Sequence, residues 1–227
     1  LGYVGGTAKD PEDAYDFDPD KPDAKDFIAY HRLSRQYKLA LNTRQFEQAR
    51  QICTELFRLY PDRLEIHYKS GRTASEQGNY VEAVEHFDIF VKSFPQNSKG
   101  LFQLGEALRK SGRFDEAVGH LGKVLQLEPD NHAARGNLGL ALIQLGRFDE
   151  AAEQFRTLLQ QAPEDANAHA QLGVALARQN RLEEAVSCYQ QALKLDPSDW
   201  QVLIHLGQAL EQLDQHEQAL NYWQEAL

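Results

Sequence analysis

The sequence predicts an all-α protein, an α-solenoid built from antiparallel helix hairpins. The first observation is that residues 137–163 hold two apolar runs at helical spacing, separated by the turn Gly146-Arg147. Gly146 can adopt the left-handed conformation that ends a helix, and Pro163 cannot continue the second helix. The second observation is that the same pattern recurs every 34 residues along most of the chain. Because neither helix can bury its apolar face alone, successive hairpins are expected to stack.

Matching residue types stand at matching places of this period. Glycine recurs at the expected crossing of the two helices, alanine recurs on the second helix, and proline ends the hairpin. These positions hold Gly71, Gly105, Gly139, Gly173 and Gly207, then Ala49, Ala83, Ala117, Ala151, Ala185 and Ala219, then Pro61, Pro95, Pro129, Pro163 and Pro197. We therefore expect twelve helices in six repeats, at residues 30–63, 64–97, 98–131, 132–165, 166–199 and 200–227.

This combination of a 34-residue period, a helix–turn–helix unit, a small residue at the crossing and a final proline resembles the tetratricopeptide repeat (TPR) family. The resemblance covers residues 30–227 and implies a right-handed superhelix. It also implies that the first helix of each hairpin lines a concave groove, where the second, fifth, sixth, ninth, twelfth and thirteenth repeat positions face a ligand. The expected function is a non-catalytic protein–protein interaction scaffold that holds a peptide or helix of its partner in this groove. The architecture does not identify that partner.

Composition excludes several classes of function. The chain is 42% hydrophobic and 26% charged, which suits a soluble helical array, and its net charge is −10. That charge argues against non-specific binding of nucleic acid, which needs a basic surface. No run approaches the ~18 apolar residues of a membrane span, so no direct membrane insertion is expected.

The two cysteines bear on the compartment. Cys53 and Cys188 lie in the first and fifth repeats, too far apart in a stacked array for a disulfide, so both are expected to be free thiols. Free thiols favour the cytoplasm, while the periplasm stays open because the chain lacks Met and resembles a fragment or processed form. The repeats are rich in Ala, Gln and Leu, which favours a bacterial source.

No residue pattern indicates catalysis, so the chain is not expected to be an enzyme. The eight histidines are scattered over several repeat positions, and no pair has the i, i+4 spacing of a zinc-binding helix. A phosphate loop and a Gly-x-Ser-x-Gly motif are also lacking, so no metal and no cofactor are expected. The alternative is that the repeats form an accessory region of a larger enzyme, such as a glycosyltransferase or sulfotransferase, or of a bacterial polysaccharide-export or secretion assembly.

The resemblance implies that the two halves of the groove differ in charge and polarity. Repeats one to three place seven basic and three acidic side chains in it, a net charge of +4, which favours an acidic partner segment. Repeats four to six place mainly neutral apolar and amide side chains in it. The candidate partner-binding residues are Arg35, Lys38, Lys69, Arg72, Lys99, Gln103, Asn137, Leu140, Gln171, Val174 and His205.

The sixth repeat position carries an amide in three successive repeats, at Gln103, Asn137 and Gln171. This row resembles the amide ladder by which the TPR region of O-linked N-acetylglucosamine transferases holds an extended peptide. Amides both donate and accept hydrogen bonds, so they suit a ligand bound through its main chain. The alternative is that they are solvated groove residues. The family's clamp for a C-terminal carboxylate is not expected, because Lys38, Lys69 and Gln103 stand where that clamp has two asparagines and an arginine.

The two ends of the chain differ from its middle. Residues 1–22 are rich in Asp and Pro and are not expected to fold independently, and Asp23 can cap the first helix, so the TPR domain is expected at 23–227. Gln36-Tyr37 replace the usual glycine-containing pair, as suits a degenerate end repeat. At the other end three apolar residues would be left uncovered and are candidates for self-association: Leu220, Trp223 and Leu227.

A second route to a homo-oligomer involves residues 1–29, which carry eight acidic and three basic side chains, a net charge of −5. An extended tail of this charge could lie in the basic end of its own groove or of a neighbour's. Tyr15 and Phe17 would be its apolar anchors, and the tail would imitate an acidic ligand. The alternative is that it packs along the first helix.

Overall fold

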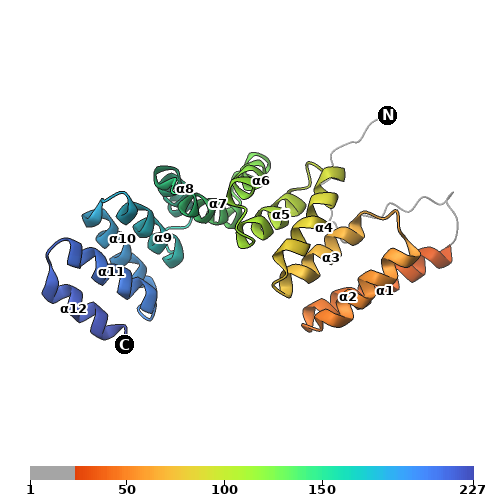
Figure 1. Ribbon diagram of the computed structural model, residues 1–227, viewed down its shortest axis with the longest axis horizontal. Helices are drawn as coiled ribbons and strands as arrows, with labels where there is room; N and C mark the ends of the chain where they lie inside the picture. The colour runs from red at the N-terminus through yellow and green to blue at the C-terminus, as the bar shows by residue number, and fades with distance from the viewer. Residues whose placement is uncertain (1–23) are drawn as a thin grey trace. The chain divides into compact units, whose positions relative to one another are not determined.

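The structure is a computed structural model that describes residues 24–227, and within this range it consists of α-helices joined by short turns (Figure 1). The chain divides into two compact units, one ending at Arg113 and the other beginning at Phe114. The predicted docking of residues 1–22 through Tyr15 and Phe17 lies outside the described residues.

The helices match the expected hairpins. The first unit holds α1 (Ala24–Asn42), α2 (Phe46–Leu59), α3 (Glu65–Glu76), α4 (Tyr80–Ser93) and α5 (Ser98–Lys110). The second holds α6 (Phe114–Leu127), α7 (His132–Gln144), α8 (Phe148–Gln161), α9 (Ala166–Arg178), α10 (Leu182–Leu195), α11 (Trp200–Gln212) and α12 (His216–Glu225). The twelve helices between residues 24 and 227 confirm the all-α solenoid of hairpins. The hand of the superhelix stays a prediction.

One residue in the left-handed conformation makes the turn inside each hairpin. Glycine supplies it in three repeats, where φ is 79° at Gly78, 85° at Gly112 and 73° at Gly146. The other three repeats hold Arg44, Asn180 and Asp214 at the same place, with φ between 57° and 60°. Glycine avoids the cost that a Cβ atom adds in this conformation, and Asn and Asp tolerate it better than most residues.

The first helices begin at a side-chain cap in four repeats. Asn97 and Asn131 accept hydrogen bonds from the backbone N–H groups of Gly100 (2.8 Å) and Ala134 (2.9 Å). Asp165 caps α9 through the N–H of Ala168, and Asp199 caps α11 through that of Val202. Each cap satisfies a donor that the helix itself cannot pair, so the start of the first helix is fixed locally.

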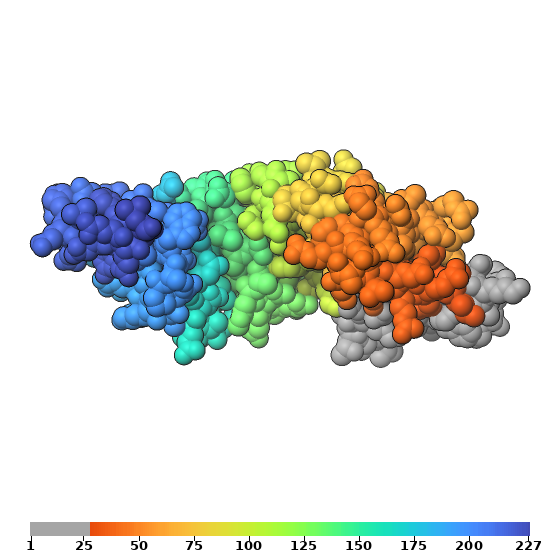
Figure 2. Space-filling model, turned by 90° about the horizontal axis from the view of Figure 1, so that it is seen from below, coloured from red at the N-terminus to blue at the C-terminus, as the bar shows by residue number. Residues whose placement is uncertain are grey.

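A glycine on the first helix faces an aromatic ring on the second in several hairpins. A Cβ atom at Gly71 would lie 2.8 Å from the ring of Phe87, and one at Gly139 would lie 2.6 Å from Cζ of Phe155. Gly173 meets Tyr189 in the same way, and Gly207 meets Trp223. The recurring glycine is therefore required by the close approach of the ring. In the second unit, side chains fill the spaces between neighbouring helices (Figure 2).

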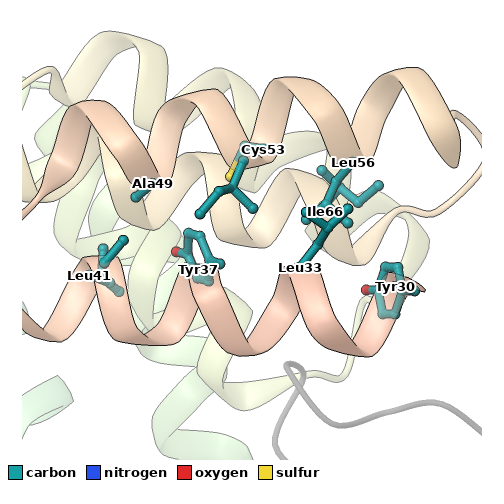
Figure 3. Packing of buried hydrophobic residues seen from close by; sticks show 10 residues of the cluster. Tyr30, Leu33, Tyr37, Leu41, Ala49, Cys53, Leu56 and Ile66 are labelled. Carbon is teal, nitrogen blue, oxygen red and sulfur yellow. The ribbon is translucent and has the colours of Figure 1, made fainter. Parts of the chain in front are cut away.

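The first repeat also pairs a small residue with a ring at the crossing, but here the ring is on the first helix and the small residue is on the second. Tyr37 of α1 stands where the other repeats have glycine, and Cys53 of α2 stands where four of them have the ring; both are buried. Figure 3 shows the Tyr37 ring pointing from α1 toward α2. Its hydroxyl donates a 2.8 Å hydrogen bond to the backbone carbonyl of Lys69, which ties the first hairpin to the second. Tyr37, which makes the first repeat look degenerate in the sequence, is thus matched in size by Cys53 on the facing helix.

Two histidines meet where α2, α3 and α4 pack together. The Nδ1 atoms of His67 and His86 are 3.0 Å apart, and Phe57 packs against both rings. Burial lowers the pKa of both imidazoles, and for His67 the neighbouring His86 lowers it further. Around His86, Glu82 and Glu85 oppose this effect, and Arg50 adds to it. One neutral ring donates to the other here, and a second proton would place two N–H donors face to face.

Two glycines of α7, only three residues apart, should respond to alanine in opposite ways. Gly139→Ala forces a Cβ atom against the buried Phe155 ring and should lower the free energy of unfolding by about 1–3 kcal/mol. Gly136→Ala meets only Leu158, at 4.0 Å, and should raise it by up to about 1 kcal/mol through helix propensity. Urea unfolding followed by circular dichroism measures both. A Gly139→Ala protein as stable as the parent would contradict the assignment of the crossing.

The His67–His86 contact should make the fold less stable in mild acid. Because their folded pKa values lie below the unfolded value of about 6.5, the unfolded chain binds protons first, and stability falls as pH drops from about 7 to 5. Replacing both residues by Asn should reduce this fall in melting temperature. His216, whose pKa is raised by Glu211, contributes with the opposite sign, so His216→Asn should steepen the fall slightly. An unchanged pH profile in the double variant would refute the effect.

Candidate functional site

The first helices of neighbouring hairpins pack side by side within each unit. α3 contacts α5 in the first unit, and α9 contacts both α7 and α11 in the second. We use the name first-helix face for the surface of these helices that carries the fifth, sixth and ninth repeat positions, such as Gly136, Asn137 and Leu140. The predicted partner-binding residues lie on α1, α3 and α5 of the first unit and on α7, α9 and α11 of the second.

In the first unit the predicted basic residues differ in exposure. Arg35 and Lys99 are exposed, Lys38 and Arg72 are half-buried, and Lys69 is buried. The Lys69 ammonium lies 5.3 Å from the centroid of the Tyr37 ring, a cation–π contact within the first two hairpins. Lys69 thus takes part in packing, which its repeat position alone did not indicate.

A polar hollow of about 280 Å³ lies between α3 and α5. Arg72 and Gln103 line it together with two carboxylates, Glu76 and Glu106. Lys110 at its edge lies 2.9 Å from Glu106 and 5.3 Å from the Tyr80 ring. Because opposite charges alternate around it, this hollow can hydrogen-bond a polar or zwitterionic group.

In the second unit the predicted amides lie on adjacent helices. Asn137 of α7 donates a 3.0 Å hydrogen bond to the carbonyl oxygen of Ala133, and Gln171 of α9 lies 3.5 Å from Oδ1 of Asn167. The next residue of the row, His205 of α11, stacks on Tyr189 at a centroid distance of 6.0 Å. Gln103, the first amide of the row, lies on α5 of the first unit. The residues of the row that lie together in one unit are therefore Asn137, Gln171 and His205. Half-buried Val174 lies on α9 with Gln171.

A second hollow, of about 270 Å³, opens between α7 and α9. Its floor is formed by Phe155 and Leu158, which are only 2% and 4% exposed, with Leu140 at the side. Asn137 and Asn167 are among the polar residues that line it. Sequence reasoning places Asn137 and Leu140 in a groove but misses the hollow. The sequence feature that could have indicated the hollow is Gly136. A glycine inside a helix lowers helix stability by about 1 kcal/mol relative to alanine, so it needs another explanation.

The last hairpin has apolar residues at its surface. Leu220 is 53% exposed and Leu227 is fully exposed, whereas Trp223 is half-buried because its ring packs on Gly207. The equivalent residues of the preceding repeat, Val186 and Leu193, are half-buried. Trp223 is therefore mainly a packing residue, and the two leucines are the exposed ones.

The described residues offer little reactive chemistry. Both thiols are free, and burial raises the pKa of Cys53 and of Cys188, which disfavours the nucleophilic thiolate. Within residues 24–227 no group of three or more His, Cys, Asp or Glu side chains could hold a metal ion. In the same range no helix combines the length and the apolar composition needed to cross a bilayer.

Comparison with known structures shows the same architecture in other proteins. MamA from Desulfovibrio magneticus RS-1, residues 41 to the end, is 25% identical with a TM-score of 0.69; the match covers 73% of this chain and 93% of that one. MamA from AMB-1 is 28% identical with a TM-score of 0.60, covering 70% and 94%. YrrB, described as a TPR protein with an unusual peptide-binding site, is 24% identical with a TM-score of 0.69, covering 80% and 90%.

Sequence comparison gives the family directly. Comparison with curated proteins finds no significant match. Profiles of the tetratricopeptide repeat match residues 35–98, 108–173, 166–199 and 188–221, which together span most of the six hairpins. The repeats and the structural neighbours support a role as a protein–protein interaction scaffold. The chain belongs to the tetratricopeptide repeat family.

Proposed function

We propose that this chain is a non-catalytic scaffold that binds an extended segment of a partner protein on its first-helix face. The observation that carries the proposal is the pairing of amides with an apolar hollow on α7 and α9. Asn137 and Asn167 line the same hollow as Phe155 and Leu158, whose side chains form its floor. An extended segment presents both kinds of group at short intervals, because main-chain amides alternate with side chains.

The amides suit main-chain recognition because each can donate and accept. Asn137 donates to the backbone carbonyl oxygen of Ala133, and Gln171 donates to the side-chain oxygen of Asn167, so each amide is paired within its own helix. A bound segment can replace these weak local hydrogen bonds by its own carbonyl and N–H groups with little rearrangement of the helices. Such an exchange favours binding only if the segment also buries apolar surface, since hydrogen bonds to water are lost at the same time.

The first unit favours an acidic partner segment. The six predicted groove positions of each of its first three repeats carry a net charge of +4 in total, although the chain as a whole is at −10. Arg35 and Lys99 are exposed, so acidic side chains can approach them from solvent. Exposed charges of this kind mainly speed association, and their effect falls with added salt.

Removing the two amides together tests the proposal. Peptides selected from a random 15-residue display library provide the ligand, and fluorescence anisotropy measures their affinity. Asn137→Ala with Gln171→Ala should weaken binding by about 1–3 kcal/mol, roughly 5- to 150-fold, without a change in the melting curve.

The matched control replaces two exposed amides on the second helices, Gln160 of α8 and Gln191 of α10, by alanine. This variant should bind as the parent does. Failure of the library to give any binding peptide would contradict the proposed function. Equal weakening in test and control variants would contradict the assignment to the first-helix face.

A second proposal concerns self-association through the last hairpin, and the 53% exposure of Leu220 supports it. The mass measured by light scattering should then rise with protein concentration. Leu220→Glu with Leu227→Glu should abolish the rise, because charges placed in an apolar interface lose their water without gaining partners. A parent protein that stays monomeric at every concentration would contradict this proposal.

A further inference from the structure

We infer that the hollow beside Gly136 is a pocket for one apolar side chain, of leucine or phenylalanine size, from the bound partner segment. The inference rests on the proposed function and adds to it the chemistry of the residue that anchors the partner. We call this hollow the Gly136 pocket, and it is defined by Gly136, Asn137 and Leu140 of α7, Phe155 and Leu158 of α8, and Asn167 of α9.

The shape of the pocket depends on the missing side chain at residue 136. The fifth repeat position holds Ala170 in the next repeat and Ile204 in the one after, and these side chains are buried and half-buried. A Cβ atom at Gly136 would instead meet only Cδ2 of Leu158, at 4.0 Å. Gly136 thus leaves open a space that neighbouring repeats fill.

Packing does not explain this glycine. Gly139, one turn later, is required because a Cβ atom there would collide with Phe155. Gly136 has no such contact and no left-handed backbone, yet it lies inside α7, where glycine weakens a helix. Gly119 and Gly122 of α6 also face open space, and Gly136 in addition lines a hollow together with the buried side chains of Phe155 and Leu158. A residue that breaks a local rule above a cavity indicates a binding role.

The lining selects for a neutral, apolar side chain. Half-buried Leu140 supplies apolar surface from which a ligand side chain can displace water, and the nearly buried Phe155 and Leu158 close the pocket beneath it. The ionisable residues in the lining are His132 and Asp165. Asp165 already accepts the N–H of Ala168 at 2.9 Å as the cap of α9. Among the described residues, no Lys or Arg side chain lines the pocket, so an acidic side chain on the apolar floor would lose its water without gaining an ion pair.

The amides are placed to bind the main chain on either side of the inserted residue. Asn137 and Asn167 line the pocket from α7 and α9, and Gln171 lies one turn beyond Asn167 on the same helix. A segment whose side chain enters the pocket carries its flanking peptide groups past these amides. The hollow between α3 and α5 is lined mainly by polar side chains. We therefore place the pocket that anchors the partner's apolar side chain in the second unit.

Blocked amino acids test the pocket without any knowledge of the partner. The probes are N-acetyl amino acid N-methylamides of leucine, phenylalanine, glycine and glutamate, which combine one side chain with two peptide groups. In ¹⁵N-correlated NMR spectra, the leucine and phenylalanine probes should shift the amide signals of Gly136, Leu140 and Asn167. Dissociation constants of roughly 1 mM are expected for ligands of this size. The glycine and glutamate probes should bind at least about 10-fold more weakly.

Gly136→Leu should fill the pocket and weaken binding of the leucine probe at least about 10-fold, with the helical circular dichroism spectrum preserved. Gly119→Leu is the control, because it adds the same side chain to α6 where nothing lies within 4 Å. If Gly136→Leu fails to fold, Leu140→Ser tests the same lining from the half-buried side wall and should also weaken the leucine probe.

The outcomes separate the pocket from the proposed function. Shifts spread over the whole surface, or a Gly136→Leu protein that binds the leucine probe as the parent does, would overturn the pocket. If library peptides bind the parent and Gly136→Leu with equal affinity, the pocket is wrong and the scaffold proposal stands. If the leucine probe binds at Gly136 but no library peptide binds, the scaffold proposal fails, and the assignment of the pocket to a partner segment fails with it.

Discussion

Contact between a glycine on the first helix and a ring on the second is the interaction on which four of the six hairpins depend. At Gly139 and Phe155 no Cβ atom fits between the helix and the ring, so the two helices approach closely over a shared core. Tyr37 and Cys53 keep the same match of large and small in the first repeat with the helices exchanged. The constraint therefore concerns combined volume at the crossing, as close packing requires, and either helix can supply the ring.

The residues that pack at the crossing are not those of the first-helix face, so the residues of that face can differ from one repeat to the next. The crossing, the left-handed turn and the cap hold each hairpin in place, so the sixth position can hold residues as different as Lys69, Asn137 and His205. The chain uses that freedom differently in its two units. The exposed basic residue Arg35 occurs in the first, and the second combines amides with the Gly136 pocket. In such a scaffold a few positions of each repeat determine which ligand is bound, and the other positions determine the fold.

Much of the fold could be predicted because its determinants are local. A 34-residue period, turn residues such as Gly146 and caps such as Asp165 act within one hairpin, and each appears in the sequence. The burial of Lys69 and the His67–His86 contact depend on side chains from different helices, which periodicity does not place. The Gly136 pocket was missed for a similar reason. Its opening is visible as a glycine, but its floor comes from α8.

The most direct test of the central claim transfers the arrangement of the first repeat into the fourth. Gly139→Tyr and Phe155→Cys are each expected to destabilise the protein, one by overpacking and the other by leaving a cavity. Together they recreate the pairing of Tyr37 with Cys53. The account predicts that urea unfolding of the double variant gives a loss smaller than the sum of the single losses by about 1–3 kcal/mol. Additive losses, within about 0.5 kcal/mol, would contradict it.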